Sequence, residues 1–160
     1  METSSAAKKL AEQVEALQAV TRVLAGVALR SVEVLHGAVT LPQFRMLAVL
    51  AGGTASRSSE VAGALGLDAS SVTRLADRLV ARGYVARGSD PRNRSVVTLE
   101  LTLVGQDLVS QVEDWRQAEL ARIIGRLTPR DRTLVATTMR QLIDAAGEGY
   151  GLALDPPVPL

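Results

Sequence analysis

Residues 65–101, LGLDASSVTRLADRLVARGYVARGSDPRNRSVVTLEL, decide the fold of this chain. Asp68 is a favourable N-cap residue for a helix, and Gly83 stands where a helix commonly ends. Between them, apolar residues recur at the three- and four-residue intervals of a helix with one buried face, at Val72, Leu75, Ala76 and Leu79. The stretch therefore predicts an amphipathic helix over residues 69–82.

The opposite face of the 69–82 helix is polar and basic, with Ser70, Ser71, Thr73, Arg74, Asp77 and Arg78. Short hydroxyl side chains allow a helix to approach DNA closely, and arginines bond guanine edges or phosphates in the major groove. A solvated surface is the alternative interpretation. The four-residue spacing of Arg74 and Arg78 beside the hydroxyls favours DNA contact. Asp77 either pairs with a neighbouring arginine or repels DNA at the edge of this face.

Two strands joined by a polar loop are predicted after this helix, at 84–87 and 95–101. Apolar residues alternate in the second strand, at Val97, Leu99 and Leu101. The loop 88–94, GSDPRNR, would place Arg92 and Arg94 at the tip of a hairpin. A helix-turn-helix followed by such a hairpin is a winged helix. An arginine at the wing tip could enter a minor groove, whose negative potential attracts it.

Positive charge is concentrated in this part of the chain. Six arginines and two aspartates lie between residues 74 and 94, whereas the whole 160-residue chain has a formal net charge of only +1. This local excess favours a polyanionic partner such as double-stranded DNA. The alternative is a winged-helix protein–protein interaction module without DNA binding, which predicts a neutral or apolar outer helix face.

Four segments of the chain resemble the multiple antibiotic resistance regulator (MarR) family. They are LPQFRMLAVL (41–50), SSEVAGALGLDASSVTRLADRLVARGYVAR (58–87), DPRNR (90–94) and VTLELTLVGQDLV (97–109). The resemblance implies a mainly α-helical fold with a small β-hairpin wing, in which long N- and C-terminal helices form an intertwined dimer. It also implies a homodimeric bacterial transcription regulator, more often a repressor than an activator. Such a regulator would bind a pseudo-palindromic DNA operator at the nucleoid.

The resemblance also implies roles for residues in the wing. In the family, the acid of the wing commonly pairs with an arginine, so Asp90 would support the wing through Arg94 and leave Arg92 for the minor groove. Members of the family typically hold a small aromatic or phenolic acid between the dimer helices and the winged helix. By that resemblance, the pocket walls would include His36, Phe44 and Arg45, and Arg45 or Arg30 could pair with a carboxylate. Packing and surface roles for these residues are the alternative.

The start of the third helix offers a further phosphate site. Arg57, Ser58 and Ser59 could bond a phosphate where backbone amides favour an anion, with structural capping as an equal alternative. The predicted DNA contacts are therefore Ser58, Ser70, Ser71, Thr73, Arg74, Arg78, Arg92 and Arg94.

Apolar residues at helical spacing predict five further helices. The first spans about 6–36, the second begins with the capping box Thr40-Leu-Pro-Gln43, and the third begins at a Ser58 or Ser59 cap. The fifth begins after its cap Thr102, and the sixth begins with Thr128-Pro-Arg-Asp131, in which Thr128 is the cap. The inner side of the fifth is expected to carry Val104, Leu108, Val112, Trp115, Ile123 and Leu127.

The chain is predicted to form one domain with three parts. The winged helix-turn-helix covers 40–101, and residues 6–39 with 102–147 supply helices for dimerisation. These helices expose more apolar surface than one protomer can cover, which predicts a twofold homodimer. Residues 1–5 are expected to fray, and the Gly- and Pro-rich tail 148–160 is expected to be flexible or docked.

Composition argues against an enzyme. The absence of cysteine excludes disulfides, thiol catalysis and thiolate metal sites, and there is a single histidine. Neither a paired-carboxylate nor a phosphate-loop motif is present, so no metal or cofactor is expected. The most apolar long stretch, 20–39, is interrupted by charged residues, so we expect no membrane span and a cytoplasmic location.

Overall fold

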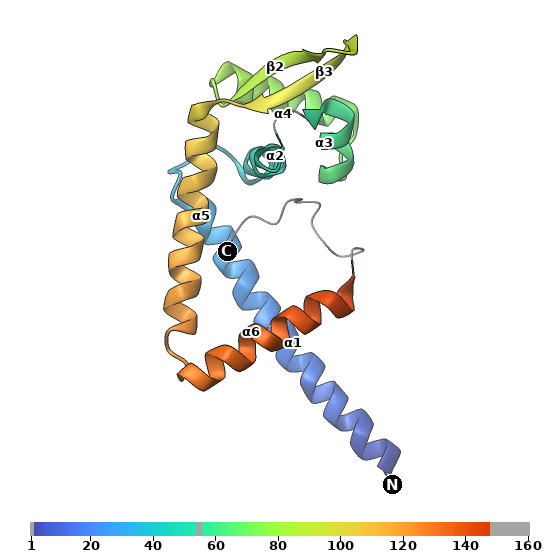
Figure 1. The fold of residues 1–160 in the computed structure, drawn as a ribbon, viewed down its shortest axis with the longest axis vertical. Coiled ribbons are helices and arrows are strands. Elements are labelled where there is room, and N and C mark those ends of the chain that lie inside the picture. Colours follow the sequence, from blue (N-terminus) through green and yellow to red (C-terminus); the bar gives the residue numbers. More distant parts are fainter. Residues whose placement is uncertain (1, 54–55, 148–160) are drawn as a thin grey trace.

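The computed structural model describes residues 2–53 and 56–147, which form six helices and a three-stranded sheet (Figure 1). In chain order the elements are α1 (Glu2–Glu33), α2 (Leu41–Ala51), β1 (Ser56–Arg57), α3 (Ser58–Leu65), α4 (Ala69–Ala81), β2 (Val85–Asp90), β3 (Asn93–Leu101), α5 (Leu103–Ile124) and α6 (Pro129–Ala146). The mainly α-helical fold with a β-hairpin wing is confirmed. The predicted tail 148–160 lies outside the described residues.

The winged helix occupies one end of the molecule (Figure 1). Its antiparallel strands have the order β1-β3-β2, with Ser56 opposite Leu99 and Val85 opposite Leu101. Helix α2 lies at the centre of this unit and contacts α3, α4, β3 and α5. Fully buried side chains in the shared core include Met46, Leu47, Val61, Val72, Leu79 and Leu99. Each such burial stabilises the fold by about 1.5–3 kcal/mol, so α4 is held firmly by its apolar face.

The hairpin differs from the prediction in where its strands end. β2 continues to Asp90 and β3 begins at Asn93, so the predicted loop 88–94 shrinks to the two-residue turn Pro91-Arg92. Arg92 lies at the tip, but Arg94 lies within β3, so its predicted place at the tip was wrong. Gly88 and Ser89 pair across the ladder with Thr98 and Val97, so the strands continue through residues that the sequence assigns to a loop. The short strand β1 was not predicted at all.

Hydrogen bonds confirm most of the predicted helix starts. The Asp68 carboxylate accepts from Ser71 N–H (2.9 Å), Thr102 Oγ1 from Gly105 N–H (3.1 Å) and Thr128 Oγ1 from Asp131 N–H (3.2 Å). The third helix is the exception, because Arg57 is its N-cap residue and Ser58 already lies inside it. Neither Ser58 nor Ser59 caps α3. Instead, the side chain of Glu60 in the first turn of α3 accepts a hydrogen bond from the backbone N–H of the N-cap residue Arg57 at 2.8 Å.

Helix α1 leaves most of its length outside the protomer's core. It begins at Glu2, so residues 2–5 are helical, contrary to the predicted fraying, and it ends at Glu33. Residues 5–25 are all exposed, and burial begins at Val27, where α1 packs on α5. Figure 1 shows the N-terminal half of α1 extending away from the rest of the molecule. Its exposed apolar side chains are Leu10, Val14, Leu17, Val20, Val23 and Leu24.

Helices α5 and α6 leave much of their apolar surface exposed, as the sequence predicts. α5 buries Leu108, Val109 and Val112, but Val104 is 54% exposed. The expectation for Val104 was wrong because Gly105 is the residue of the first turn that faces the winged helix. Leu127 follows the end of α5 and is also exposed. α6 has no buried residue at all.

Gly105 packs directly against the backbone of Tyr84. A Cβ added at Gly105 would lie 2.1 Å from the carbonyl oxygen of Tyr84, which itself accepts a hydrogen bond from Thr102 N–H at 3.1 Å. Because backbone rather than a flexible side chain obstructs the site, we predict that Gly105→Ala lowers the free energy of unfolding by about 1–3 kcal/mol. Urea denaturation followed by circular dichroism measures this change.

Gly63→Ala is the matched control for this prediction. Gly63 lies in α3, and nothing comes within 4 Å of a Cβ added there. Because alanine loses less backbone entropy than glycine in a helix, this variant should raise the free energy of unfolding by about 0.5–1 kcal/mol. Equal losses in the two variants would contradict the packing described for Gly105.

Candidate nucleic-acid interface

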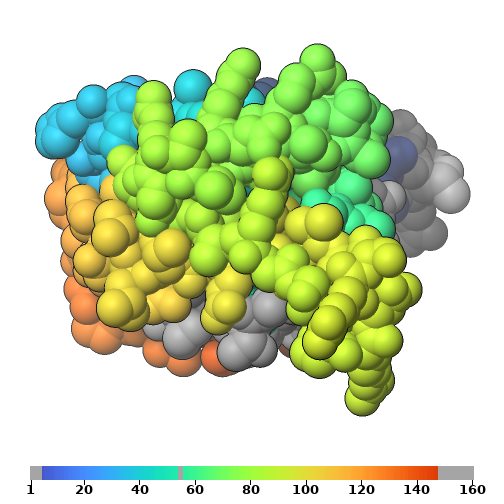
Figure 2. Space-filling model, turned by 90° about the horizontal axis from the view of Figure 1, so that it is seen from above, coloured from blue at the N-terminus to red at the C-terminus, as the bar shows by residue number. Residues whose placement is uncertain are grey.

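Helix α4 turns its polar face to solvent at the winged-helix end of the molecule. As predicted, Val72, Ala76 and Leu79 are fully buried and Leu75 is half-buried. The opposite side carries Ser70, Thr73, Arg74, Asp77 and Arg78, all exposed, together with the half-buried Ser71. Figure 2 views this face directly, with α4 and the neighbouring hairpin forming one surface and the wing reaching past its edge.

The hydroxyl groups at the start of α4 are bound to the helix itself. Ser70 Oγ donates to Asp68 Oδ1 (2.6 Å), and Ser71 Oγ donates to Asp68 Oδ2 (2.7 Å). Thr73 Oγ1 donates to the carbonyl oxygen of Ala69 (2.9 Å). Because a hydroxyl has a single hydrogen, these groups keep only their acceptor lone pairs for another molecule. They would therefore accept from amino groups at base edges rather than donate to phosphates.

Asp68 carries a carboxylate that is strongly favoured in its charged form. Hydrogen bonds from the hydroxyls of Ser70 and Ser71, and then from the Ser71 amide, hold the pKa of this carboxyl far below its usual range. A negative charge at a helix N-terminus also interacts favourably with the helix dipole. The start of α4 is thus fixed by a charged cap, and Arg74 Nη2 extends the same network by donating to Ser70 Oγ (3.0 Å).

Two arginines near α4 make protein contacts. Arg87 of β2 pairs with Asp77 of α4, at 2.7 Å between Nη1 and Oδ1, which decides between the two interpretations of Asp77 in favour of a salt bridge. Both side chains are substantially exposed, so this ion pair adds little stability. It does neutralise the only acid on the polar face of α4. Arg82 donates to the carbonyl oxygen of Ala38 and so ties the end of α4 to the turn after α1.

The wing is supported by a pair other than the predicted one. Asp90 Oδ2 binds Arg57, at 2.8 Å from Nη2 and 3.1 Å from Nε, and not Arg94. Asp90 lies opposite Asn93, and successive side chains alternate between the faces of a strand, so Arg94 points to the other face. Asp90 Oδ1 accepts from the Arg92 backbone N–H (2.8 Å), which closes the turn. The hydrogen bond from the Arg92 amide, followed by those from the Arg57 side chain, lowers the pKa of Asp90.

The pairing of Arg57 with Asp90 was not predicted, because the sequence suggested only a phosphate ligand or a capping residue at position 57. The partner of Arg57 lies 33 positions away, and no local pattern links the two residues.

Ser58, predicted to contact DNA, is half-buried at the first position of α3. Arg78 and Arg92 are exposed, and no side-chain hydrogen bond or ion pair of either is found within residues 2–53 and 56–147. These two guanidinium groups are therefore available to an external anion.

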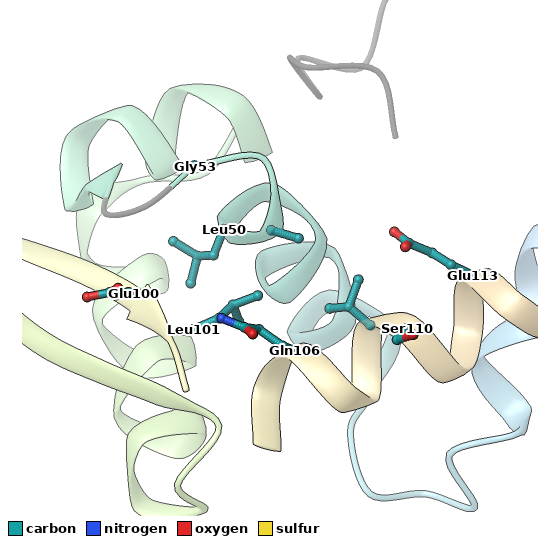
Figure 3. A pocket seen from close by; sticks show the side chains of 9 residues that line it. Leu50, Gly53, Glu100, Leu101, Gln106, Ser110 and Glu113 are labelled. Carbon is teal, nitrogen blue, oxygen red and sulfur yellow. The ribbon is translucent and has the colours of Figure 1, made fainter. Parts of the chain in front are cut away.

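The residues predicted for an effector differ in how far they are exposed to solvent. Phe44 is buried in the core, whereas His36 and Arg45 are exposed. A hollow of about 260 Å³ instead lies between the end of α2, β3 and α5 (Figure 3). Its lining includes Glu100 and Glu113 but no basic residue. Burial raises the pKa of Glu113.

Residues 2–53 and 56–147 contain no group of three His, Asp or Glu side chains placed to hold a metal ion. Over the same residues, none of the helices combines the length and the apolar character that crossing a bilayer requires.

Comparison with known proteins places this architecture in a family. The family profile described as "MarR family" matches residues 39–94. The chain is 32% identical over 108 residues to the HTH-type transcriptional repressor MdtR of Bacillus subtilis, covering 68% of this chain and 70% of that protein. The chain belongs to the MarR family. This is a family of transcription regulators rather than of enzymes.

Solved structures agree with this assignment of the chain to the MarR family. RV1404 from Mycobacterium tuberculosis shares 30% identity with a TM-score of 0.78, covering 84% of this chain and 92% of that one. YusO from Bacillus subtilis shares 29% identity with a TM-score of 0.71, covering 86% and 96%. The resemblance predicted from four sequence motifs thus extends over most of the chain, including the long helices outside the winged helix.

The charged cap of α4 predicts a pH dependence of stability. Because the folded-state pKa of Asp68 is depressed, its contribution is complete above the unfolded pKa of about 3.9 and is lost as the pH falls below it. Asp68→Asn keeps a good N-cap but cannot titrate. We therefore predict that the free energy of unfolding falls less steeply below pH 4 in Asp68→Asn than in the wild type. Urea denaturation between about pH 2.5 and 7, a range that includes the unfolded pKa of about 3.9, tests this; parallel curves would contradict it.

Proposed function

We propose that two copies of this MarR-family protein bind a pseudo-palindromic DNA operator and regulate transcription as a repressor. One observation carries the proposal: Arg74, Arg78 and Arg92 are exposed on two adjacent elements at one end of the molecule. A helix with such side chains fits the major groove of B-form DNA, while an arginine on the neighbouring wing reaches the adjacent minor groove. The name of the relative MdtR, a transcriptional repressor, supports the sign of regulation.

The unpaired apolar surfaces of α1 and α6 support a homodimer. Leu10 in α1 and Ile143 in α6 are 61% and 68% exposed, and neither side chain belongs to the buried core. A twofold axis through these helices would bury the same patch on both protomers. It would also place two α4 helices about 34 Å apart, one turn of B-form DNA, so that a palindromic operator matches the symmetry of the protein. Repression would follow from occlusion of a promoter at the nucleoid.

The dimer can be tested by charge substitution. We predict that the wild type has twice the 16.9 kDa chain mass in light scattering at micromolar concentration, and that Leu17→Asp combined with Ile143→Asp yields a monomer. The reason is that two carboxylates would have to be buried without partners in the interface.

Leu103→Asp is the control for the dimer test. Leu103 is 78% exposed at the start of α5, away from the proposed interface, and an acid is favourable at a helix N-terminus. This variant should remain dimeric. A monomeric wild type, or dissociation by Leu103→Asp alone, would contradict the proposed interface.

The DNA contacts can be tested by truncating individual arginines. We predict that Arg74→Ala and Arg92→Ala each weaken operator binding by about 1–3 kcal/mol, since each removes a charged contact to a base edge or groove. The operator would first be selected from random duplexes, and affinities would then be measured by gel shift at several salt concentrations.

The salt dependence distinguishes DNA binding from the alternative function. A DNA-binding protein releases counterions, so the affinity of the wild type should fall steeply with rising salt. A winged helix that serves only protein–protein contact predicts no salt-dependent retention of any duplex. Unchanged affinity in both arginine variants, at matched salt, would show that α4 and the wing do not contact DNA as proposed.

Release of DNA by a small phenolic or aromatic acid stays a prediction of the family resemblance. The two carboxylates that line the hollow in Figure 3 would repel such an anion. An acidic effector would therefore have to bind elsewhere, where Arg45 or Arg30 is exposed to meet its carboxylate. Repeating the duplex selection with aromatic acids present would show whether the protein responds to them.

A further inference from the structure

Arg57 lies where the sheet, the helix-turn-helix and the wing meet. It is the last residue of β1, where it stands opposite Thr98 of β3, and it is also the N-cap residue of α3. Its backbone N–H donates to Glu60 Oε2 at 2.8 Å. The main chain of Arg57 is thus held by a strand on one side and by a helix on the other, so its side chain projects from a firmly placed backbone.

The guanidinium of Arg57 reaches the turn of the wing through one intermediate residue. Nε and Nη2 both donate to Asp90 Oδ2, at 3.1 and 2.8 Å, and the other carboxylate oxygen accepts from the Arg92 backbone N–H at 2.8 Å. The side chain of Asp90 is only 11% exposed, so this charge-assisted contact is shielded from water. A continuous chain of hydrogen bonds therefore runs from the start of α3 to the residue at the wing tip.

The wing needs such a contact because its outer part is only two strands wide. β1 pairs with β3 at Leu99 and Thr98, and beyond that point the hairpin consists of β2 and β3 alone. Two-stranded ribbons are marginally stable and variable in twist. Among the ion pairs of the described residues, Arg57–Asp90 joins the tip to the helix-turn-helix, whereas Arg87–Asp77 acts nearer the base of β2.

We propose that Arg57 is a positioning residue for DNA binding: through Asp90 it fixes the wing tip so that Arg92 is aimed at the minor groove. In this proposal Arg57 acts through Asp90, to which its Nε and Nη2 are committed, rather than by binding DNA itself. The inference rests on the proposed DNA-binding function and adds the residue that orients the wing. It also predicts that the identity of the side chain matters, since lysine lacks the planar fork that binds Asp90 from two nitrogens.

A double-mutant cycle with the selected operator tests this role. Arg57→Gln should weaken binding by about tenfold in the wild-type background but by less than about twofold in Arg92→Ala, because the loss acts through Arg92. Arg57→Lys should behave like Arg57→Gln. As a reference, Arg57→Gln is combined with Arg74→Ala. The loss of affinity in that double variant should equal the product of the fold-losses in the two single variants. Arg130→Gln in α6, which removes an exposed charge at the far end of α5, should leave the affinity unchanged.

Amide hydrogen exchange in the DNA-free protein provides a second readout. Arg57→Gln should speed exchange at residues 88–94, while exchange in α5 and the unfolding midpoint in urea stay close to the wild-type values. The proposal would be overturned in favour of a direct phosphate contact if Arg57→Gln lowered the affinity equally in the wild-type and Arg92→Ala backgrounds while Arg57→Lys still bound the operator. Unchanged exchange at the wing would also overturn it. If the wild type bound no duplex at all, the proposed function itself would fall, whereas faster exchange at the wing would still show that Arg57 anchors the tip.

Discussion

The packing of the apolar face of α4 into the winged-helix core is the constraint on which the rest of the structure depends. Val72, Ala76 and Leu79 are completely removed from water, and they contact a core built around α2. This burial fixes the rotation of α4 about its own axis. Arg74 and Arg78 consequently face solvent. In Figure 2, α4 and the hairpin lie on the same face of the molecule. A rotation of α4 by one position would bury a charged side chain and expose the core, at a cost of several kcal/mol.

Local signals in the sequence were sufficient to predict the helices and their order. The three- and four-residue periodicity of α4, the Asp68 cap and the Thr128 cap all act within one or two helical turns, so each is visible in a short window of sequence. Gly83 has a positive φ of 74° and lets the chain leave α4 at the predicted place. The candidate contact residues on α4 followed directly, because a helix with a known buried face has a known exposed one.

Features that depend on contacts between distant residues were the ones that the sequence did not predict. The strand β1 has two residues and exists only because β3 lies beside it, 41 positions later at the Arg57–Thr98 pair. Composition suggested a loop at 88–94, but ladder pairing extends both strands through polar residues. The partner of Asp90 was misassigned for the same reason: Arg94 is near in sequence, whereas Arg57 is near in space.

The structure also refines what the concentration of positive charge means. Of the arginines between residues 74 and 94, Arg82 holds the end of α4 to the turn after α1, and Arg87 is neutralised by Asp77. Both side chains shape the winged helix, and Arg87 contributes less to an external field because Asp77 offsets its charge. Arg78 and Arg92, by contrast, stand on separate elements that are each fixed by a carboxylate, Asp68 for α4 and Asp90 for the wing. Both carboxylates have pKa values below the usual range, so both anchors are fully charged at neutral pH. In the proposed function, affinity for a polyanion would then depend less on total charge than on two acids that hold a few arginines in place, Asp68 as the cap of α4 and the buried Asp90 in the wing.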